Sequence, residues 1–137
     1  MNRSDLQDLA NIRIREATIL LKASEYSGAY YLAGYAVECA LKACFAKTVK
    51  RYDFPERGRA DKVFIHRLPE LAVLARLKSG LDAARQQSGE FDANWLRACE
   101  WTEESRYSTW TREDATAILD AIAGRKNGVL PWIKQRW

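Results

Sequence analysis

The sequence is poor in the residues that most often hold metal ions. It has one histidine, His66, and three cysteines, Cys39, Cys44 and Cys99, which form no CxxC pair. Zinc sites need several such ligands at short spacings, so we expect neither a metal nor another cofactor. An odd number of cysteines, without a secretory leader, is typical of a reducing compartment. We therefore expect the three thiols to fill the core as small apolar side chains.

Long apolar stretches and strand patterns are also missing. The first residues, MNRSDLQDLAN, are polar, and the longest apolar run is interrupted at Glu38, well short of a membrane span. No segment alternates between apolar and polar residues, and no internal repeat or low-complexity tract is present. These absences predict a cytoplasmic protein that does not enter the membrane and whose fold class is all-α.

What the sequence does contain is the composition of a globular chain. Of its 137 residues, 47% are hydrophobic and 29% are charged, so we expect residues 1–137 to form a single domain. The spacing of apolar residues predicts an antiparallel up-and-down bundle of four to five helices. The expected elements are helices over about 5–23 (after a capping box at 4–7), 28–50, 69–79, 81–101 (weak at 88–89) and 111–124, an ordered loop over 101–110 and a final turn over 129–137.

Positive charge is concentrated in one part of the chain. Residues 42–67 hold eight lysines and arginines against three acidic residues, and 51–67 contain Pro55 and Gly58 without helical periodicity. We expect a long basic loop there, with Arg57 and Arg59 among its cations. Such a cluster either binds phosphate backbones or forms a solvated charged surface.

The predicted helix over 28–50 is unusually rich in small residues. Ala33, Gly34, Ala36 and Ala40 would let a neighbouring element approach closely. Glu38 and Lys42 stand four residues apart, in the order that favours a helical ion pair. This pair is either a solvated surface pair, which contributes little to stability, or part of a functional site.

The segment YYLAGYAVECALKA, residues 30–43, resembles the second helix of HEPN domains, an all-α family named for nucleotide binding in higher eukaryotes and prokaryotes. HRLPEL at 66–71 is similar to the family's entry to its third helix. Trp101, the pair Arg106 and Tyr107, and Asp114 with Ala115 resemble the region that precedes and opens the last helix. The resemblance covers about residues 5–125.

This resemblance implies RNA cleavage or nucleotide binding, a homodimer, and a toxin–antitoxin pairing with a small nucleotidyltransferase. Nuclease members carry an arginine followed, after four to six residues, by a histidine near a late helix. Here Thr111, Arg112 and Glu113 occupy the positions where that histidine would follow Arg106. Arg59 and His66 have a permitted spacing, but they lie before the predicted third helix.

Three hypotheses follow for the function, and the third of them is a purely structural homodimer built by Glu38, Lys42 and the face of small residues, with no ligand. The first is a non-catalytic dimeric module that binds nucleotide or RNA, a nucleotidyltransferase partner, or both. The second is a metal-independent ribonuclease in which His66 moves protons and Arg59 or Arg106 holds the phosphate. His66 has a structural alternative, which is packing or hydrogen bonding at a helix start. The candidate binding residues are Glu38, Lys42, Arg57, Arg59, Arg106 and Tyr107, and the candidate catalytic residues are His66 and Arg106.

Two aromatic features also allow alternative interpretations. Arg106 and Tyr107 either close a loop over the end of the bundle or hold a phosphate while the ring stacks on a base. The five tryptophans either supply core and interface area or offer stacking platforms for unpaired bases.

Overall fold

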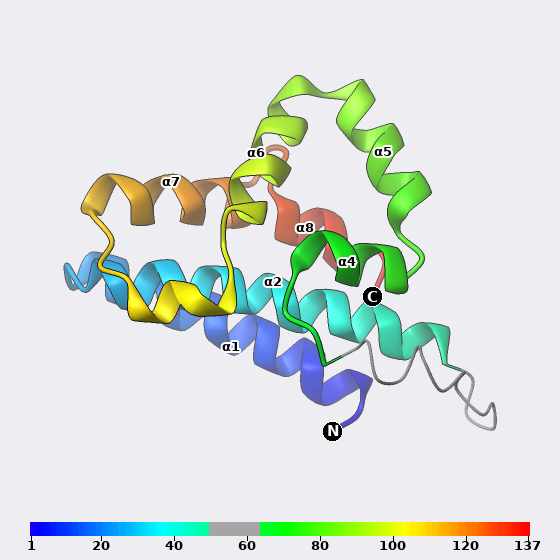
Figure 1. The fold of residues 1–137 in the computed structure, drawn as a ribbon, viewed down its shortest axis with the longest axis horizontal. Coiled ribbons are helices and arrows are strands. Elements are labelled where there is room, and N and C mark those ends of the chain that lie inside the picture. Colours follow the sequence, from blue (N-terminus) through cyan, green and yellow to red (C-terminus); the bar gives the residue numbers. More distant parts are fainter. Residues whose placement is uncertain (50–63) are drawn as a thin grey trace.

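The fold is an all-α bundle, as the sequence predicts. The computed structural model describes residues 1–49 and 64–137, and these ranges contain helices and no strand (Figure 1). Seven α-helices and one 3-10 helix are present in them, which is more than the four to five helices expected. The elements are α1 (Arg3–Lys22), α2 (Tyr26–Thr48), α4 (Leu68–Leu74), α5 (Lys78–Gln87), α6 (Gly89–Cys99), η1 (Glu103–Tyr107), α7 (Arg112–Ala123) and α8 (Val129–Lys134).

The two longest helices, α1 and α2, lie side by side and antiparallel (Figure 1). The capping box of α1 is formed by Asn2 and Asp5, two residues before the predicted one, because the Asn2 side chain accepts from the Asp5 backbone amide. The turn to α2 places Ser24 at a φ of 64°. This left-handed residue lets the chain reverse over a very short connection.

The region from α4 to α6 contains one more break than predicted. Gly80 lies inside α5 rather than at a helix end, and the chain breaks earlier, at Arg76, whose φ is 59°. The expected weak point at 88–89 is a true boundary, because Ser88 accepts a hydrogen bond from the Phe91 amide and caps α6. The predicted loop over 101–110 contains η1, and the predicted final turn is α8.

Helix α2 is the centre of the bundle. It contacts α1, α4, α7, α8 and η1, and thirteen of its 23 residues are buried. A helix surrounded in this way needs small or apolar side chains on most of its circumference, which explains why its sequence shows no narrow apolar stripe. None of the helices in the described ranges is both long and apolar enough to cross a membrane.

Gly34, in the middle of α2, receives the indole ring of Trp101. A Cβ atom at this position would overlap Cγ, Cδ1 and Cδ2 of that ring. Trp101 is only 1% exposed, and its Nε1 donates a hydrogen bond of 3.0 Å to the carbonyl oxygen of Tyr31. The small residues of α2 therefore admit an aromatic side chain as well as neighbouring helices.

The cysteines are part of the core, as expected. Cys39 and Cys44 are buried, and Cys99 is partly buried against the core. Burial raises the pKa of Cys39 and of Cys44 to about 11 and that of Cys99 to about 12. The thiols therefore stay protonated near neutral pH and are poor nucleophiles.

Candidate functional site

Glu38 forms a buried cluster with Lys42 and His66. Its side chain is only 3% exposed, and Oε1 accepts a hydrogen bond of 2.7 Å from Nζ of Lys42. The same oxygen lies 2.9 Å from Nδ1 of His66. The pair of Glu38 and Lys42 is therefore not a solvated surface pair, which was one of the two interpretations left open by the sequence.

The positions of the three side chains explain how α2 can bury an acid. A carboxylate removed from water needs charged or hydrogen-bonding partners to offset its lost solvation. Lys42 supplies one from the next turn of α2, and His66 supplies the other from the segment that leads into α4. The cluster thus ties that segment to the central helix.

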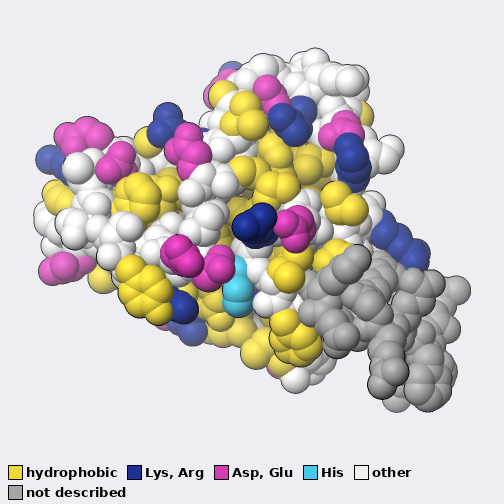
Figure 2. Space-filling view, viewed as in Figure 1, with side chains coloured by type: hydrophobic (Ala, Val, Ile, Leu, Met, Phe, Trp, Pro, Cys, Tyr) yellow, Lys and Arg dark blue, Asp and Glu magenta, His cyan; other side chains and the backbone are white. Residues whose placement is uncertain are grey.

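The contact with Glu38 also defines the chemistry of the histidine. If Nδ1–H of a neutral His66 donates a hydrogen bond to the carboxylate, the other ring nitrogen, Nε2, carries no proton and can act as a base. The His66 side chain is 44% exposed, so it reaches the surface from a buried anchor. Figure 2 shows the histidine at the surface, with acidic and apolar side chains around it.

A second group of candidate side chains lies at η1. The Arg106 guanidinium is 4.9 Å from the centroid of the Tyr107 ring, and the neighbouring phenols of Tyr107 and Tyr31 raise its pKa. Tyr107 is 77% exposed. On α2, the Tyr31 ring stacks on that of Tyr35, with 6.1 Å between the centroids. An exposed arginine is thus held against phenol rings at the surface.

Two tryptophans hold the segment that carries Arg106 and Tyr107. Trp101, at the start of the segment, is buried in the bundle. Trp110, at its end, stacks on Tyr30, with 3.7 Å between the ring centroids and 7° between the ring planes. Nε1 of Trp110 donates to the carbonyl oxygen of Ser105 at 3.0 Å, and its backbone amide donates to Oγ of Ser27 at 2.9 Å. The loop predicted to be ordered is therefore fixed at both ends.

All five tryptophans contribute to the core, which favours the first of their two interpretations. Trp95 and Trp101 are buried, and Trp110, Trp132 and Trp137 are partly buried against the core. Within the described ranges, the large exposed aromatic side chains are those of Tyr107 and Phe64. Stacking on an unpaired base at η1 would therefore use Tyr107.

The structure brings the sequence-predicted residues together in two groups. Glu38, Lys42 and His66 form one, and Arg106 and Tyr107 form the other around Tyr31. Seven residues separate Tyr31 from Glu38, which corresponds to about 10 Å along α2. Arg57 and Arg59, together with most of the predicted basic loop, lie outside the described residues.

Tyr31 and Tyr35 were missed as candidate site residues. A signal was available for both, because positions 31, 35, 38 and 42 follow helical spacing and share one face of α2.

The positions where a family histidine would follow Arg106 have a structural role. Thr111 is the N-cap of α7, and its hydroxyl accepts a hydrogen bond from the Asp114 amide. In return, the Asp114 carboxylate accepts from the backbone amide and the hydroxyl of Thr111, and these hydrogen bonds lower its pKa. This stretch begins a helix and offers no group that transfers protons near neutral pH.

Comparison with known proteins gives no relative for this arrangement: no family model, curated protein or solved structure matches the chain. Within residues 1–49 and 64–137, no three histidine, cysteine, aspartate or glutamate side chains lie close enough to hold a metal ion.

Proposed function

We propose that this protein is a non-catalytic helical module of the HEPN type that binds RNA or nucleotide at the surface formed by η1 and α2. The observation that carries the proposal is the fixed, exposed pair of Arg106 and Tyr107. A guanidinium can bind a phosphate through two parallel hydrogen bonds, and an exposed phenol ring can stack on an unpaired base.

The arrangement of the motif residues supports the HEPN assignment. Two fragments that are far apart in the sequence each contact α2, the helix that carries the strongest resemblance. His66 bonds to Glu38, and Trp101, at the start of the segment that carries Arg106, packs on Gly34. A shared family would explain why these separate fragments meet on one helix.

The same resemblance leads us to propose a homodimer and a nucleotidyltransferase partner in a toxin–antitoxin pair. Sedimentation of the purified protein would measure the first, with a mass of twice 15.7 kDa expected. For the second, we expect a neighbouring reading frame to encode a small nucleotidyltransferase that copurifies with this chain on coexpression. A monomer, or a neighbour that does not copurify, would contradict the respective proposal.

RNA binding can be tested by fluorescence anisotropy with an end-labelled single-stranded RNA and, in competition, a nucleoside triphosphate. We expect Arg106→Ala and Tyr107→Ala each to weaken binding about tenfold, given the usual contribution of one stacked base. Arg97→Ala is the matched control, because Arg97 is an arginine of comparable exposure on α6. If RNA and nucleotide both fail to bind, or if the control weakens binding equally, the proposal is wrong.

A metal-independent ribonuclease remains the second candidate, favoured by the contact between His66 and Glu38. With Nδ1 bonded to the carboxylate, Nε2 could take the proton of a ribose 2′-hydroxyl. The 2′-oxygen would then bond to phosphorus, the bond to the 5′-oxygen would break, and that oxygen would accept a proton. Within the described residues, no hydrogen bond or ion pair joins Arg106 to His66 or Glu38, so the structure does not pair this arginine with the histidine.

This candidate predicts that the purified protein cleaves mixed RNA without added metal and leaves 2′,3′-cyclic phosphate ends. His66→Ala should abolish the cleavage, and Glu38→Gln should reduce it by removing the carboxylate that orients the ring. Cleavage that survives His66→Ala would remove that residue from the mechanism. Cleavage that His66→Ala abolishes would replace the non-catalytic proposal.

A further inference from the structure

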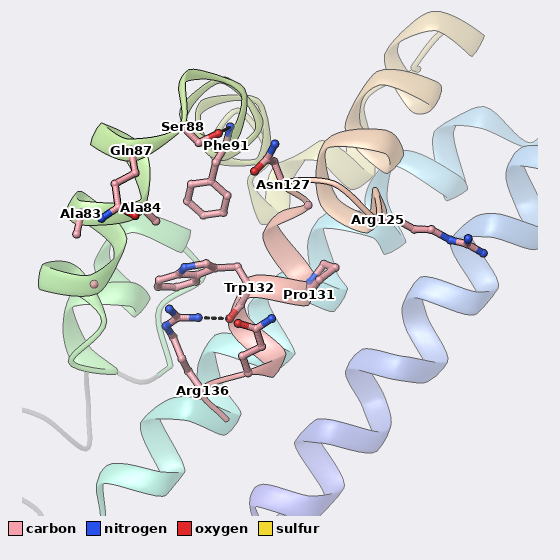
Figure 3. Close-up of a pocket in the computed structure, with 13 residues that line it drawn as sticks. Ala83, Ala84, Gln87, Ser88, Phe91, Arg125, Asn127, Pro131, Trp132 and Arg136 are labelled. Atoms are coloured by element: carbon pink, nitrogen blue, oxygen red, sulfur yellow. Dashed lines mark hydrogen bonds between the residues drawn. The ribbon is translucent and has the colours of Figure 1, made fainter.

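A cavity of about 520 Å³ lies between α5, α6 and α8 (Figure 3). None of the residues discussed above as candidate binding or catalytic residues lines it. Its volume falls in the range of sites that hold small molecules. It is open to solvent, and its walls differ in chemistry.

One wall is aromatic and carries a fixed cation. The rings of Phe91 and Trp132 meet at a tilt of 44°, with 5.7 Å between their centroids. On the other side of the indole, the Arg136 guanidinium lies 3.7 Å from the ring centroid and donates a hydrogen bond of 2.8 Å to the Trp132 carbonyl oxygen. Figure 3 shows Phe91 and Arg136 on opposite sides of the Trp132 ring.

The facing wall is formed by small residues of α5. A Cβ atom at Gly80 would lie 3.7 Å from the Trp132 ring and 4.0 Å from Nε of Arg136, which are ordinary contact distances. Packing therefore does not require glycine here, although glycine is unfavourable inside a helix. Ala83 and Ala84 continue this wall. At Gly80 the helix backbone thus approaches the indole closely, and the open part of this wall is formed by the small side chains of Ala83 and Ala84.

The polar groups of the cavity favour an anionic ligand. No acidic residue lines it, whereas two arginines do, and Arg136 is the one beside Trp132, because Arg125 points away from the ring (Figure 3). The side-chain amides of Gln87 and Gln135 also line the cavity and make no hydrogen bond within the described part of the chain. They can donate to or accept from a ligand.

From these features we propose that the cavity binds a small molecule that combines a planar ring with an anionic group. The ring packs beside Trp132 against Ala83 and Ala84, and the anion lies toward Arg136. Aromatic carboxylates and nucleoside monophosphates share this chemistry. The site is independent of the surface formed by η1 and α2.

The test is isothermal titration calorimetry with three probes: naphthalene-1-carboxylate, its neutral amide and adenosine monophosphate. We expect one-to-one binding of at least one anion, and binding of the neutral amide at least fivefold weaker than that of the carboxylate if the carboxylate is the anion that binds. Binding of the carboxylate alone assigns the site to aromatic acids, and binding of the monophosphate alone assigns it to nucleotides. If neither anion binds, or if the amide binds as well as the carboxylate, the proposal is overturned.

Substitutions in and outside the cavity test whether the ligand binds there. Ala83→Leu places a larger side chain in the cavity from an exposed position where leucine is a good helix former, and it should weaken binding at least tenfold. Ala93→Leu is the matched control, because Ala93 is an exposed alanine on α6 that does not line this cavity, and it should leave binding unchanged. Arg136→Gln should weaken binding of the anion, and Arg106→Ala should not. Equal binding by Ala83→Leu and the wild type, or equal losses in Ala83→Leu and Ala93→Leu, would refute the assignment.

Discussion

Gly34→Ala should destabilise the bundle, although this change stabilises most helices. Alanine is favoured over glycine inside a helix by about 0.5–1 kcal/mol. At position 34, however, the added Cβ would overlap three atoms of the buried Trp101 ring. Overpacking of this kind costs about 1–3 kcal/mol. If the ring moves, the hydrogen bond from Nε1 to the Tyr31 carbonyl is also lost, at about 0.5–1.5 kcal/mol.

The net expectation is a decrease of about 2 kcal/mol in the free energy of unfolding, measured by urea denaturation. Gly89→Ala is the control, because a Cβ there meets nothing within 4 Å, and it should be neutral or stabilising. The decisive measurement is a double-mutant cycle with Trp101→Ala. In that background the obstruction is gone, so Gly34→Ala should become neutral or stabilising. If Gly34→Ala is as stable as Gly89→Ala, or if the cycle shows no coupling, the close packing of ring on helix is wrong.

Three further predictions concern the ion pair, the helix cap and the thiols. Glu38→Gln should lower the free energy of unfolding by about 1–3 kcal/mol, because it removes a buried carboxylate with two partners, while Glu16→Gln, which breaks the partly exposed pair with Arg13, should cost less than about 1 kcal/mol in the same urea titration. Thr111→Ala should cost about 1 kcal/mol by removing the cap of α7, and Thr109→Ala, two residues earlier and exposed, should be neutral in thermal melts. Burial raises the pKa values of Cys39 and Cys44 from about 9 to about 11, so the folded protein holds these protons more tightly than the unfolded chain. The stabilisation that results is complete below pH 9, and the free energy of unfolding falls as the pH rises from about 9 to about 11, by about 1.4 kcal/mol per pH unit and per thiol. Urea titrations at pH 8 and pH 10 would measure this loss, and Cys44→Ala should show a smaller one; an equal loss in both proteins would contradict the burial of that thiol.

Helical periodicity was sufficient to predict the fold class, because it reflects contacts between residues a few positions apart. The short connection between the first two predicted helices was sufficient to predict that α1 and α2 are antiparallel neighbours. The position of the break before α5 could not be predicted. Gly80 looked like a helix end, whereas the chain turns earlier, at Arg76, a residue with no intrinsic preference for the left-handed conformation it adopts. Tertiary packing decides such a position, and local sequence carries little information about it.

In the candidate site, too, contacts within one helix could be predicted and contacts between distant parts of the chain could not. The contact of Glu38 with Lys42 follows from their spacing on one helix, but 28 residues separate Glu38 from His66. A single sequence does not specify which distant side chain completes a buried charge. Gly34 likewise predicted a close approach without naming Trp101 as the group that approaches. The cavity beside Trp132 combines α5 with α8, and no motif links them.

The two indoles at 101 and 110 have a consequence for the variability of the surface between them. Because the bundle holds both ends of this stretch, its outward side chains can change without altering the helices below. Tyr107 and its exposed neighbours therefore form an exchangeable segment on a constant frame. Grafting a different sequence onto 106–109 should redirect recognition while the melting temperature stays near its original value.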